Sequence, residues 1–317
     1  MKKMLSKKGF ELSFNWLFAI IVGAAIIFLA IFLASRIVEN QRAISQSELG
    51  KELEVILSPL ETGVEEGKLS SIIYPVETRI FNSCKESSVG FQEISVASSS
   101  GVSQKWEESG KKTISKNKFI FSQNIIQGKK FNVFSKPFNF PFEVANFLFI
   151  LPENQDYCMV NPPKYIESEV QDLLFDFVNI SSEKRYCEKS ALTICFTSAL
   201  CDININLDAH SVRKEKYSLY YSDYDNQNSM LYAAIFSSPE IYECNLKRIM
   251  QKTSELSQVY LKKEEVLNSI CSINLGPELE ILKNKTLSLN NSRDILIIQN
   301  YAKSIGDKNE ILSCKLF

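Results

Sequence analysis

The sequence predicts an α+β protein with an N-terminal transmembrane helix that continues into a stalk helix. Three observations support this fold class. Residues 12–35 contain no charged side chain, as in a membrane-spanning helix. After residue 68, short apolar runs separated by turn residues indicate an ectodomain rich in antiparallel sheet. Residues 237–317 repeat apolar side chains at helical spacing, so the C-terminal part is expected to be helical.

The uncharged segment is long enough to cross a lipid bilayer, since about 20 apolar residues span its hydrocarbon core as a helix. We assign residues 1–13 to a cytoplasmic N-terminus and residues 14–36 to the membrane helix. A signal peptide that is removed would have a shorter apolar region, so we expect the anchor to be retained. An excess of basic residues marks the cytoplasmic side and predicts an extracytoplasmic location for the rest. These basic residues are Lys2, Lys3, Lys7 and Lys8.

The membrane helix also offers a contact surface for a protein partner. Ala19 and Gly23, like Ala30 and Ala34, are small residues four positions apart. This spacing lets two membrane helices approach closely. It is also ordinary transmembrane composition, which is the interpretation we favour.

The N-terminal sequence Lys-Lys-Gly-Phe-Glu at residues 7–11, followed by the apolar helix, resembles the leader of type IV pilins and archaeal pilin-like proteins. The resemblance covers about the first 58 residues. It implies that a membrane peptidase cuts after Gly9 and that the helix packs into a filament or a secretion pseudopilus. Bacterial pilins carry a glutamate at the fifth position after the cut, which is Phe14 here, whereas the acid is Glu11. As a whole, the chain resembles uncharacterised archaeal membrane-anchored surface proteins, which implies no activity.

The eight cysteines all follow the anchor and are predicted to form disulfides. None is in a Cys-x-x-Cys motif, and there is one histidine, so neither a metal site nor a cofactor is expected. Disulfides require an oxidising compartment, which agrees with the predicted topology. Their connectivity does not follow from sequence, although spacing suggests one bridge among residues 187, 195 and 201, and one from Cys314 to Cys271 or Cys244. The candidates are Cys84, Cys158, Cys187, Cys195, Cys201, Cys244, Cys271 and Cys314.

Charge and short motifs add two expectations. The formal net charge of −1 argues against nucleic acid as a partner, because such proteins present a basic face. Asn179, Asn284 and Asn290 each begin an Asn-x-Ser/Thr sequence, the acceptor for N-glycosylation. The predicted external location permits modification at these three residues.

Residues 37–58 continue the membrane helix as a helical stalk, which is expected to end before Pro59. We assign residues 59–236 to an extracytoplasmic α+β domain. Its aromatic segment 136–151 is either an exposed surface for a partner or a buried strand bordered by prolines. We favour the buried strand, because phenylalanine is among the residues that are often buried.

The middle of this domain is predicted to hold one helix and four strands. The pair Pro162-Pro163 opens a helix that is expected to reach about Val178. Residues 192–197 and 203–208 alternate apolar and polar side chains, which is typical of half-buried strands. Residues 216–221 and 230–236 are expected to form a second pair. Residues 190–236 are therefore predicted to be an antiparallel meander.

The C-terminal region 237–317 is predicted to be helical and to pack on this domain. A helix of about 30 residues begins near Pro239 and carries one apolar stripe. Two shorter helices are expected over 277–287 and 292–305. The stripe of the 239–271 helix suits either a protein partner, as in a coiled coil, or packing against these shorter helices. We favour the second interpretation.

Candidate catalytic residues are few. His210 follows Asp208, but no nucleophile elbow sequence is present. The loop with Asp223, Asp225, Asn226 and Asn228 lacks the glycine and distal glutamate of an EF-hand. The sequence therefore favours a non-enzymatic structural or binding module, anchored in the membrane and belonging to a cell-envelope or secretion assembly. The alternatives are a pilin-like subunit processed after Gly9 and a surface hydrolase or transferase.

Overall fold

The computed structural model is a mixed α+β structure, which confirms the predicted fold class. The chain divides into two compact units, Met1–Ser45 and Gln46–Phe317. Gly9, the predicted processing site, lies outside the described part of the chain. The structure describes residues 14–61, 69–86, 90–99, 106, 109–197, 200–224, 227–271 and 273–317.

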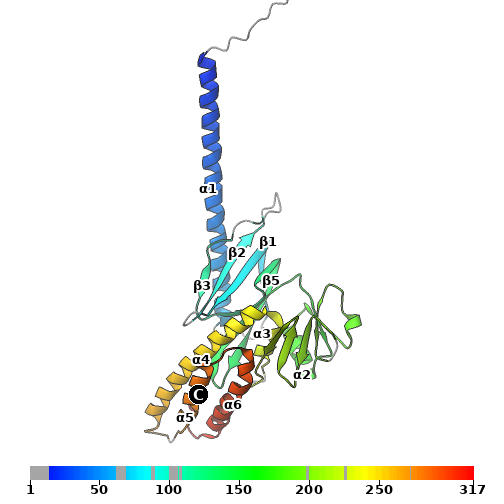
Figure 1. The fold of residues 1–317 in the computed structure, drawn as a ribbon, viewed down its shortest axis with the longest axis vertical. Coiled ribbons are helices and arrows are strands. Elements are labelled where there is room, and N and C mark those ends of the chain that lie inside the picture. Colours follow the sequence, from blue (N-terminus) through cyan, green and yellow to red (C-terminus); the bar gives the residue numbers. More distant parts are fainter. Residues whose placement is uncertain are drawn as a thin grey trace, which may run out of the picture. The chain divides into compact units, whose positions relative to one another are not determined.

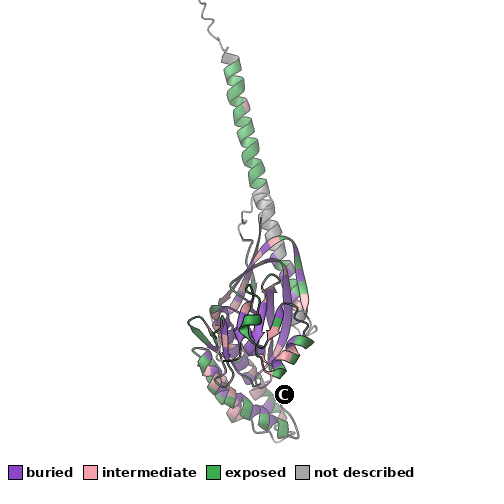
Figure 2. Cartoon of the chain, turned by 90° about the vertical axis from the view of Figure 1, so that its right-hand side faces the viewer, coloured by how far each residue is buried: buried purple, intermediate pink, exposed green. Residues whose placement is uncertain are grey.

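Helix α1 runs from Phe14 to Glu61 and begins with the apolar segment (Figure 1). Trp16–Ile37 is the one helical segment, among the described residues, that is long and apolar enough to cross a membrane. Its side chains are almost all exposed, as the green colour in Figure 2 shows. Such a helix fits a single-pass membrane anchor, because lipid would cover the apolar side chains. The helix continues past Pro59, where the sequence predicted its end.

The first sheet has six strands and is antiparallel except at one edge. β4 pairs in parallel with β6, while the other neighbours are antiparallel. The strand order is β3 (Thr113–Ser115), β2 (Phe91–Ser98), β1 (Ser70–Lys85), β5 (Ile125–Asn139), β6 (Glu143–Pro152) and β4 (Phe119–Phe121).

This sheet must curl strongly, because consecutive strands lie at its two edges. β3 and β4 are separated by only residues 116–118. A flat sheet would place these edge strands about 24 Å apart, at about 4.8 Å per strand. Four residue steps reach at most about 14 Å. The linker therefore draws the two edges of the sheet together.

A buried polar seam joins the edges. The Nε2 atom of Gln92 on β2 donates to the carbonyl oxygen of Ile120 on β4 at 2.7 Å, and its Oε1 accepts from the Ile120 N–H at 2.8 Å. Asn82 of β1 and Asn245 of α4 (Pro239–Leu267) donate to the same carbonyl. Gln92 is fully buried. The seam thus satisfies backbone groups of β4 that no neighbouring strand reaches.

The concave side of the sheet encloses a largely aliphatic core. Leu53 and Leu57, near the end of α1, are fully buried in it. The end of the predicted stalk is therefore part of the core of the unit Gln46–Phe317. The remaining members come from β1, β2, β4, β5 and β6: Ile72, Tyr74, Ile80, Ile94, Val96, Ile120, Ile126, Phe131, Val133, Leu148 and Ile150.

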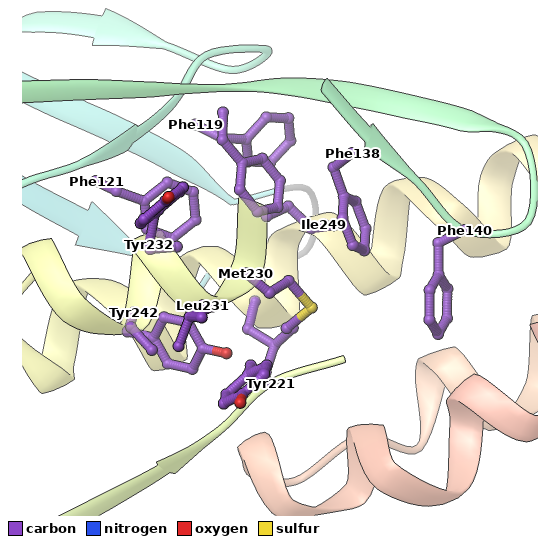
Figure 3. Packing of buried hydrophobic residues seen from close by; sticks show 14 of the residues in the cluster. Phe119, Phe121, Phe138, Phe140, Tyr221, Met230, Leu231, Tyr232, Tyr242 and Ile249 are labelled. Atoms are coloured by element: carbon purple, nitrogen blue, oxygen red, sulfur yellow. The ribbon is translucent and has the colours of Figure 1, made fainter. Parts of the chain in front are cut away.

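The other side of the sheet packs on α3 (Ser229–Phe236) and α4 through an aromatic core (Figure 3). Phe121, Phe138 and Phe149 are fully buried there, and the Phe134 and Phe149 rings stack at 4.5 Å. Segment 136–151 supplies much of this core. The prediction that this segment is buried rather than an exposed surface is confirmed, but it forms the end of β5, a turn and most of β6 instead of one strand.

The second sheet is antiparallel at one end and parallel at the other. β10–β11–β12 are antiparallel, whereas β8, β7, β9 and β10 run in parallel. The strand order is β12 (Tyr217–Tyr220), β11 (Ser211–Lys214), β10 (Ile203–Asn206), β9 (Leu192–Cys195), β7 (Tyr157–Val160) and β8 (Val178–Ser181).

The predicted antiparallel meander over 190–236 is wrong in two places. First, β9 and β10 are parallel, because the chain returns to the start of β9 before β10 begins. Cys195–Cys201 closes this return, and the Asp202 carboxylate accepts from the Thr193 N–H and hydroxyl at 2.9 and 2.6 Å. Two strands joined by a short loop are usually antiparallel, so the alternating pattern alone was misleading.

Second, residues 230–236 form helix α3 and not a strand. All eight residues of α3 are buried, so no polar face marks its period. A short apolar run of this kind does not distinguish a buried strand from a buried helix. The helix prevails because its backbone groups are satisfied within the segment, whereas a strand would need neighbours inside the core.

Helix α2 (Lys164–Asp172) ends earlier than Val178, where the sequence predicted its end. Leu174 adopts a left-handed backbone with φ 52° and is 78% exposed. The chain turns there, so that Phe175 and Phe177 enter the core before β8 begins. The apolar residues that predicted one helix up to Val178 therefore belong to a shorter helix and to the turn that follows it.

The C-terminal helices are α4, α5 (Gly276–Leu287) and α6 (Ile295–Ile311), with a short 3₁₀ turn at Ser292–Asp294 before α6. Ser238 caps α4 by accepting from the Ile241 N–H, and Pro239 follows in the first turn. Along the apolar stripe of α4, Tyr242, Leu246 and Ile249 are buried against the sheets. The later part of α4 lies along α5, as favoured from the sequence.

All eight cysteines are paired, which fits an oxidising extracytoplasmic environment. Cys84–Cys244 connects β1 to α4, and Cys158–Cys187 covers one side of β7. Cys195–Cys201 is the bridge expected among residues 187, 195 and 201. Of the two partners suggested for Cys314, the structure pairs it with Cys271.

The seam makes a stability prediction. Gln92→Leu removes the partners of the Ile120 N–H and of Asn82 Oδ1, which accepts from Gln92 at 2.6 Å. Two buried unsatisfied groups should lower the unfolding free energy by about 2–4 kcal/mol. Urea unfolding of the full chain in micelles, followed by near-UV circular dichroism, measures the loss.

The matched control for this prediction is Gln127→Leu on β5. Gln127 is only half-buried and bonds side chains at the surface, so its replacement should cost less than about 1 kcal/mol. Equal losses in the two variants would show that the seam does not hold the sheet closed.

Candidate functional site

A cleft of about 880 Å³ opens between the β5–β6 turn and α6. It receives residues from five separate parts of the chain, including α4 and the segment after β12. The volume is within the range of roughly 300–1,000 Å³ that is typical of ligand sites. Its lining consists of Asn139, Pro141, Phe142, Glu143, Asp223, Tyr224, Tyr260, Gln299, Asn300, Lys303, Gly306, Asp307, Glu310 and Phe317.

Three aromatic rings line one part of the cleft. The Phe142 ring lies 4.5 Å from that of Tyr260 and 5.5 Å from that of Phe317, and the last two are 5.3 Å apart. The turn between β5 and β6 supplies Phe142, α4 supplies Tyr260, and the chain end supplies Phe317. Their mutual contacts hold the rings in fixed positions, which favours recognition of a flat or cationic group.

Gly306 of α6 permits a second aromatic residue to approach the helix. A Cβ atom at this position would lie 2.2 Å from the hydroxyl oxygen of Tyr224, and 3.7 Å from Pro141. The Tyr224 ring in turn packs edge-on against Phe140 at 5.8 Å. The absence of a side chain at Gly306 therefore brings the 221–224 segment, α6 and the β5–β6 turn together around the cleft.

Carboxylates outnumber cations among the residues that line the cleft. There are four, Glu143, Asp223, Asp307 and Glu310, against one ammonium group, that of Lys303. Two of the four already have partners. Asp223 lies 3.3 Å from His210 Nε2, and Glu310 pairs with Lys315.

The other two carboxylates, those of Glu143 and Asp307, have no ion-pair partner within 4.0 Å among the described side chains. Glu143 lies close enough to Tyr260 to influence it. Burial raises the pKa of the Tyr260 hydroxyl, and the charge of Glu143 raises it further.

A buried polar network adjoins the cleft through the segment after β12. Glu169 of α2 pairs with Lys136 of β5, and its other oxygen accepts from Asn228 at 2.9 Å and from the Tyr232 hydroxyl at 3.0 Å. Burial raises the pKa of Tyr232 well above its usual value, and Glu169 contributes further. Both Glu169 oxygens are engaged, so this network links α2, β5 and α3 and leaves no free base for chemistry.

His210 lies in the turn between β10 and β11 with a left-handed backbone, φ 45°. Its imidazole faces Asp223, and its carbonyl accepts from the Tyr221 N–H. Among the described residues, no serine or cysteine is hydrogen-bonded to the imidazole. This geometry supplies an acid–histidine pair at the margin of the cleft without a nucleophile.

The three glycosylation candidates do not line the cleft. Asn179 on β8, Asn284 on α5 and Asn290 before the 3₁₀ turn are all exposed. Asp225 and Asn226 lie outside the described residues.

Sequence reasoning missed the cleft, because its aromatic and acidic residues are far apart along the chain. Lys136 was the one visible signal of the neighbouring network, since a lysine inside an apolar aromatic strand needs a buried partner.

No protein-family model, curated protein or solved structure matches this chain. Any function must therefore be inferred from the chemistry of the cleft and the anchor. In the described part of the chain, no three His, Cys, Asp or Glu side chains are grouped so that they could hold a metal ion.

Helix α3, which carries Tyr232, is held at its C-terminal end by Lys214 of β11. The Lys214 ammonium donates to the carbonyl oxygens of Ile235 and Ser237 at 2.5 and 2.6 Å. These carbonyls have no partner within the helix, so a cation is favourable there. Burial nevertheless lowers the pKa of Lys214 to about 7.

This pKa predicts a pH dependence of stability. A lysine in an unfolded chain has a pKa near 10.4, so between about pH 7 and 10 the unfolded state binds more protons and stability rises with pH. Lys214→Met lacks this contribution. The unfolding free energy of wild type minus that of the variant should rise by roughly 1 kcal/mol per pH unit from about pH 7.5 to 9.5.

Urea unfolding at several pH values measures this difference. Lys216→Met, at an exposed position two residues away, is the control and should give a constant difference from wild type. A constant difference for Lys214→Met would instead mean that the ammonium keeps its proton on the two carbonyls.

Proposed function

We propose that this protein is an extracytoplasmic binding module, anchored in the membrane by α1 with its N-terminus in the cytoplasm. Residues after the anchor form the binding part, which belongs to a cell-envelope or secretion assembly. The cleft between the β5–β6 turn and α6 is the ligand site. No catalytic role is assigned to it.

Three features support the anchored, external location. The apolar segment Trp16–Ile37 is exposed along its whole length, and a bilayer would cover it. The lysines before it favour a cytoplasmic N-terminus. The four disulfides are compatible with an oxidising compartment on the other side.

The observation that carries the binding role is the cleft of about 880 Å³ itself. Concave sites with an aromatic wall and a few polar groups are the usual form of ligand sites. Glu143 and Asp307 are free to pair with a ligand, and the three packed rings offer a preorganised apolar wall.

A pilin-like subunit is the second candidate. Helix α1 supports it, since one continuous helix carries an exposed apolar first half and buries Leu53 and Leu57 at its end. Such a helix can pack laterally against copies of itself while the ectodomain remains attached. In this role the chain would be cut after Gly9.

Intact mass of the membrane-extracted protein, with and without reduction and alkylation, separates these possibilities. The binding module is expected to retain its first nine residues and to show eight oxidised cysteines. Loss of those residues would instead support the pilin-like subunit. Eight free thiols would contradict the extracytoplasmic location, and with it both proposals.

The cleft is tested by filling it. Asn300 lies on α6, is exposed and lines the cleft, so Asn300→Trp should block the site without disturbing the core. Saturation-transfer NMR with polar fragments, on the full chain in nanodiscs, should give binding fragments that the variant loses. Asn284→Trp, at an exposed position on α5 outside the cleft, is the matched control and should keep them. Fragments that bind both variants equally would refute the assignment of the site.

A further inference from the structure

The cleft has an excess of negative charge on its rim. Four carboxylates and one ammonium group line it. Since Asp223 already faces His210 and Glu310 pairs with Lys315, the ligand would meet chiefly Glu143 and Asp307. An anionic ligand would be repelled there, whereas a cation would be attracted.

The aromatic wall has the same preference. The face of an aromatic ring carries negative potential and attracts cations within about 6 Å. Tyr260 already illustrates this, because the Lys263 ammonium lies 5.7 Å from the centre of its ring. Phe317 is half-buried and lies beside Tyr260, so it extends this surface, while Phe142 is buried and packs against both rings from within.

The amide groups of the cleft add an acceptor. The Oε1 atom of Gln299 is buried and has no hydrogen-bond partner among the described residues. A buried acceptor of this kind is costly unless a donor reaches it. Together with two unpaired carboxylates, it matches a ligand that carries several N–H donors and few acceptors.

From these three observations we propose that the ligand of the cleft is a small organic cation with several N–H donors, such as an aliphatic polyamine. Its ammonium groups would pair with Glu143 and Asp307 and lie against the aromatic wall. The aliphatic carbons between them would cover the rings. This inference rests on the proposed binding role of the cleft and adds the chemical class of its ligand.

Calorimetric titration of the full chain in zwitterionic nanodiscs with spermidine tests this class. The double variant Glu143→Gln/Asp307→Asn should weaken binding by about tenfold, because both ion pairs with the ligand are lost and each is exposed to solvent. Asn300→Trp should abolish the heat of binding. The control Glu188→Gln/Glu265→Gln removes the same charge at two exposed positions outside the cleft and should bind as wild type does.

A matched pair of probes separates charge from shape. 1,4-Diaminobutane should bind measurably more tightly than 1,4-butanediol, which has the same carbon chain and no charge. Spermidine binding that both double variants weaken equally would reveal non-specific attraction to surface carboxylates and would overturn the proposal.

Failure of the ligand class is distinguishable from failure of the site. Failure of spermidine to bind, together with binding of cellobiose to wild type and not to Asn300→Trp, would make the cleft a binding site for neutral ligands. The proposed cationic ligand class would then be refuted. If Asn300→Trp changes the binding of no probe or fragment, the cleft is not a ligand site, and the proposed function fails together with this inference.

Discussion

The structure depends on closing the first sheet through the three-residue linker 116–118. Because β3 and β4 are consecutive in the chain and lie at opposite edges, the sheet has to curl until those edges meet. Closure creates an inner side, and the end of α1 fills it with Leu53 and Leu57. It also leaves backbone groups of β4 inside the molecule without a strand partner. Gln92 supplies both a donor and an acceptor for Ile120, as a neighbouring strand would.

The same closure positions the cleft. Helix α4 is fixed to the seam at its N-terminal end by Asn245, by Arg248 and by the Cys84–Cys244 bridge. From there α4 continues without a break to Tyr260, which lies about 23 Å from Asn245 along the helix axis at about 1.5 Å per residue. The β5–β6 turn, a product of the same sheet, brings Phe142 against that ring. The cleft is therefore built between parts whose positions follow from the closed sheet, and the Cys271–Cys314 bridge holds the chain end beside it.

Local sequence patterns predicted what depends on neighbours along the chain. The apolar segment of α1, the capped start of α4 at Ser238 and the burial of segment 136–151 are of this kind, because composition and spacing suffice for each. Patterns failed where tertiary packing decides. Helix α3 is buried on all sides, so its sequence shows no alternation of apolar and polar faces at helical spacing. The direction of β10 depends on the hydrogen bonds between Asp202 and Thr193, which are not visible as a local pattern. The cleft depends on contacts between residues as distant as Phe142 and Phe317, so no motif marks it.

The polar seam contains a buried cation, Arg248, which contacts the linker between the two edge strands. Arg248 is 4% exposed, and burial lowers its pKa to about 10, so it stays charged at neutral pH. Its partners are the carbonyls of Lys116 and Lys118, the Asn245 amide oxygen and the ring face of Phe119, with no carboxylate among the described residues. Buried charge is a poor source of stability, since desolvation offsets much of the attraction. The role of the guanidinium here is to fix the register of the linker through the directions of its N–H donors. An apolar residue at position 248 could pack against several registers of the linker, whereas a guanidinium with fixed donor directions accepts only the register that presents these two carbonyls. The cation therefore selects the one closure of the sheet from which the helices and the cleft follow.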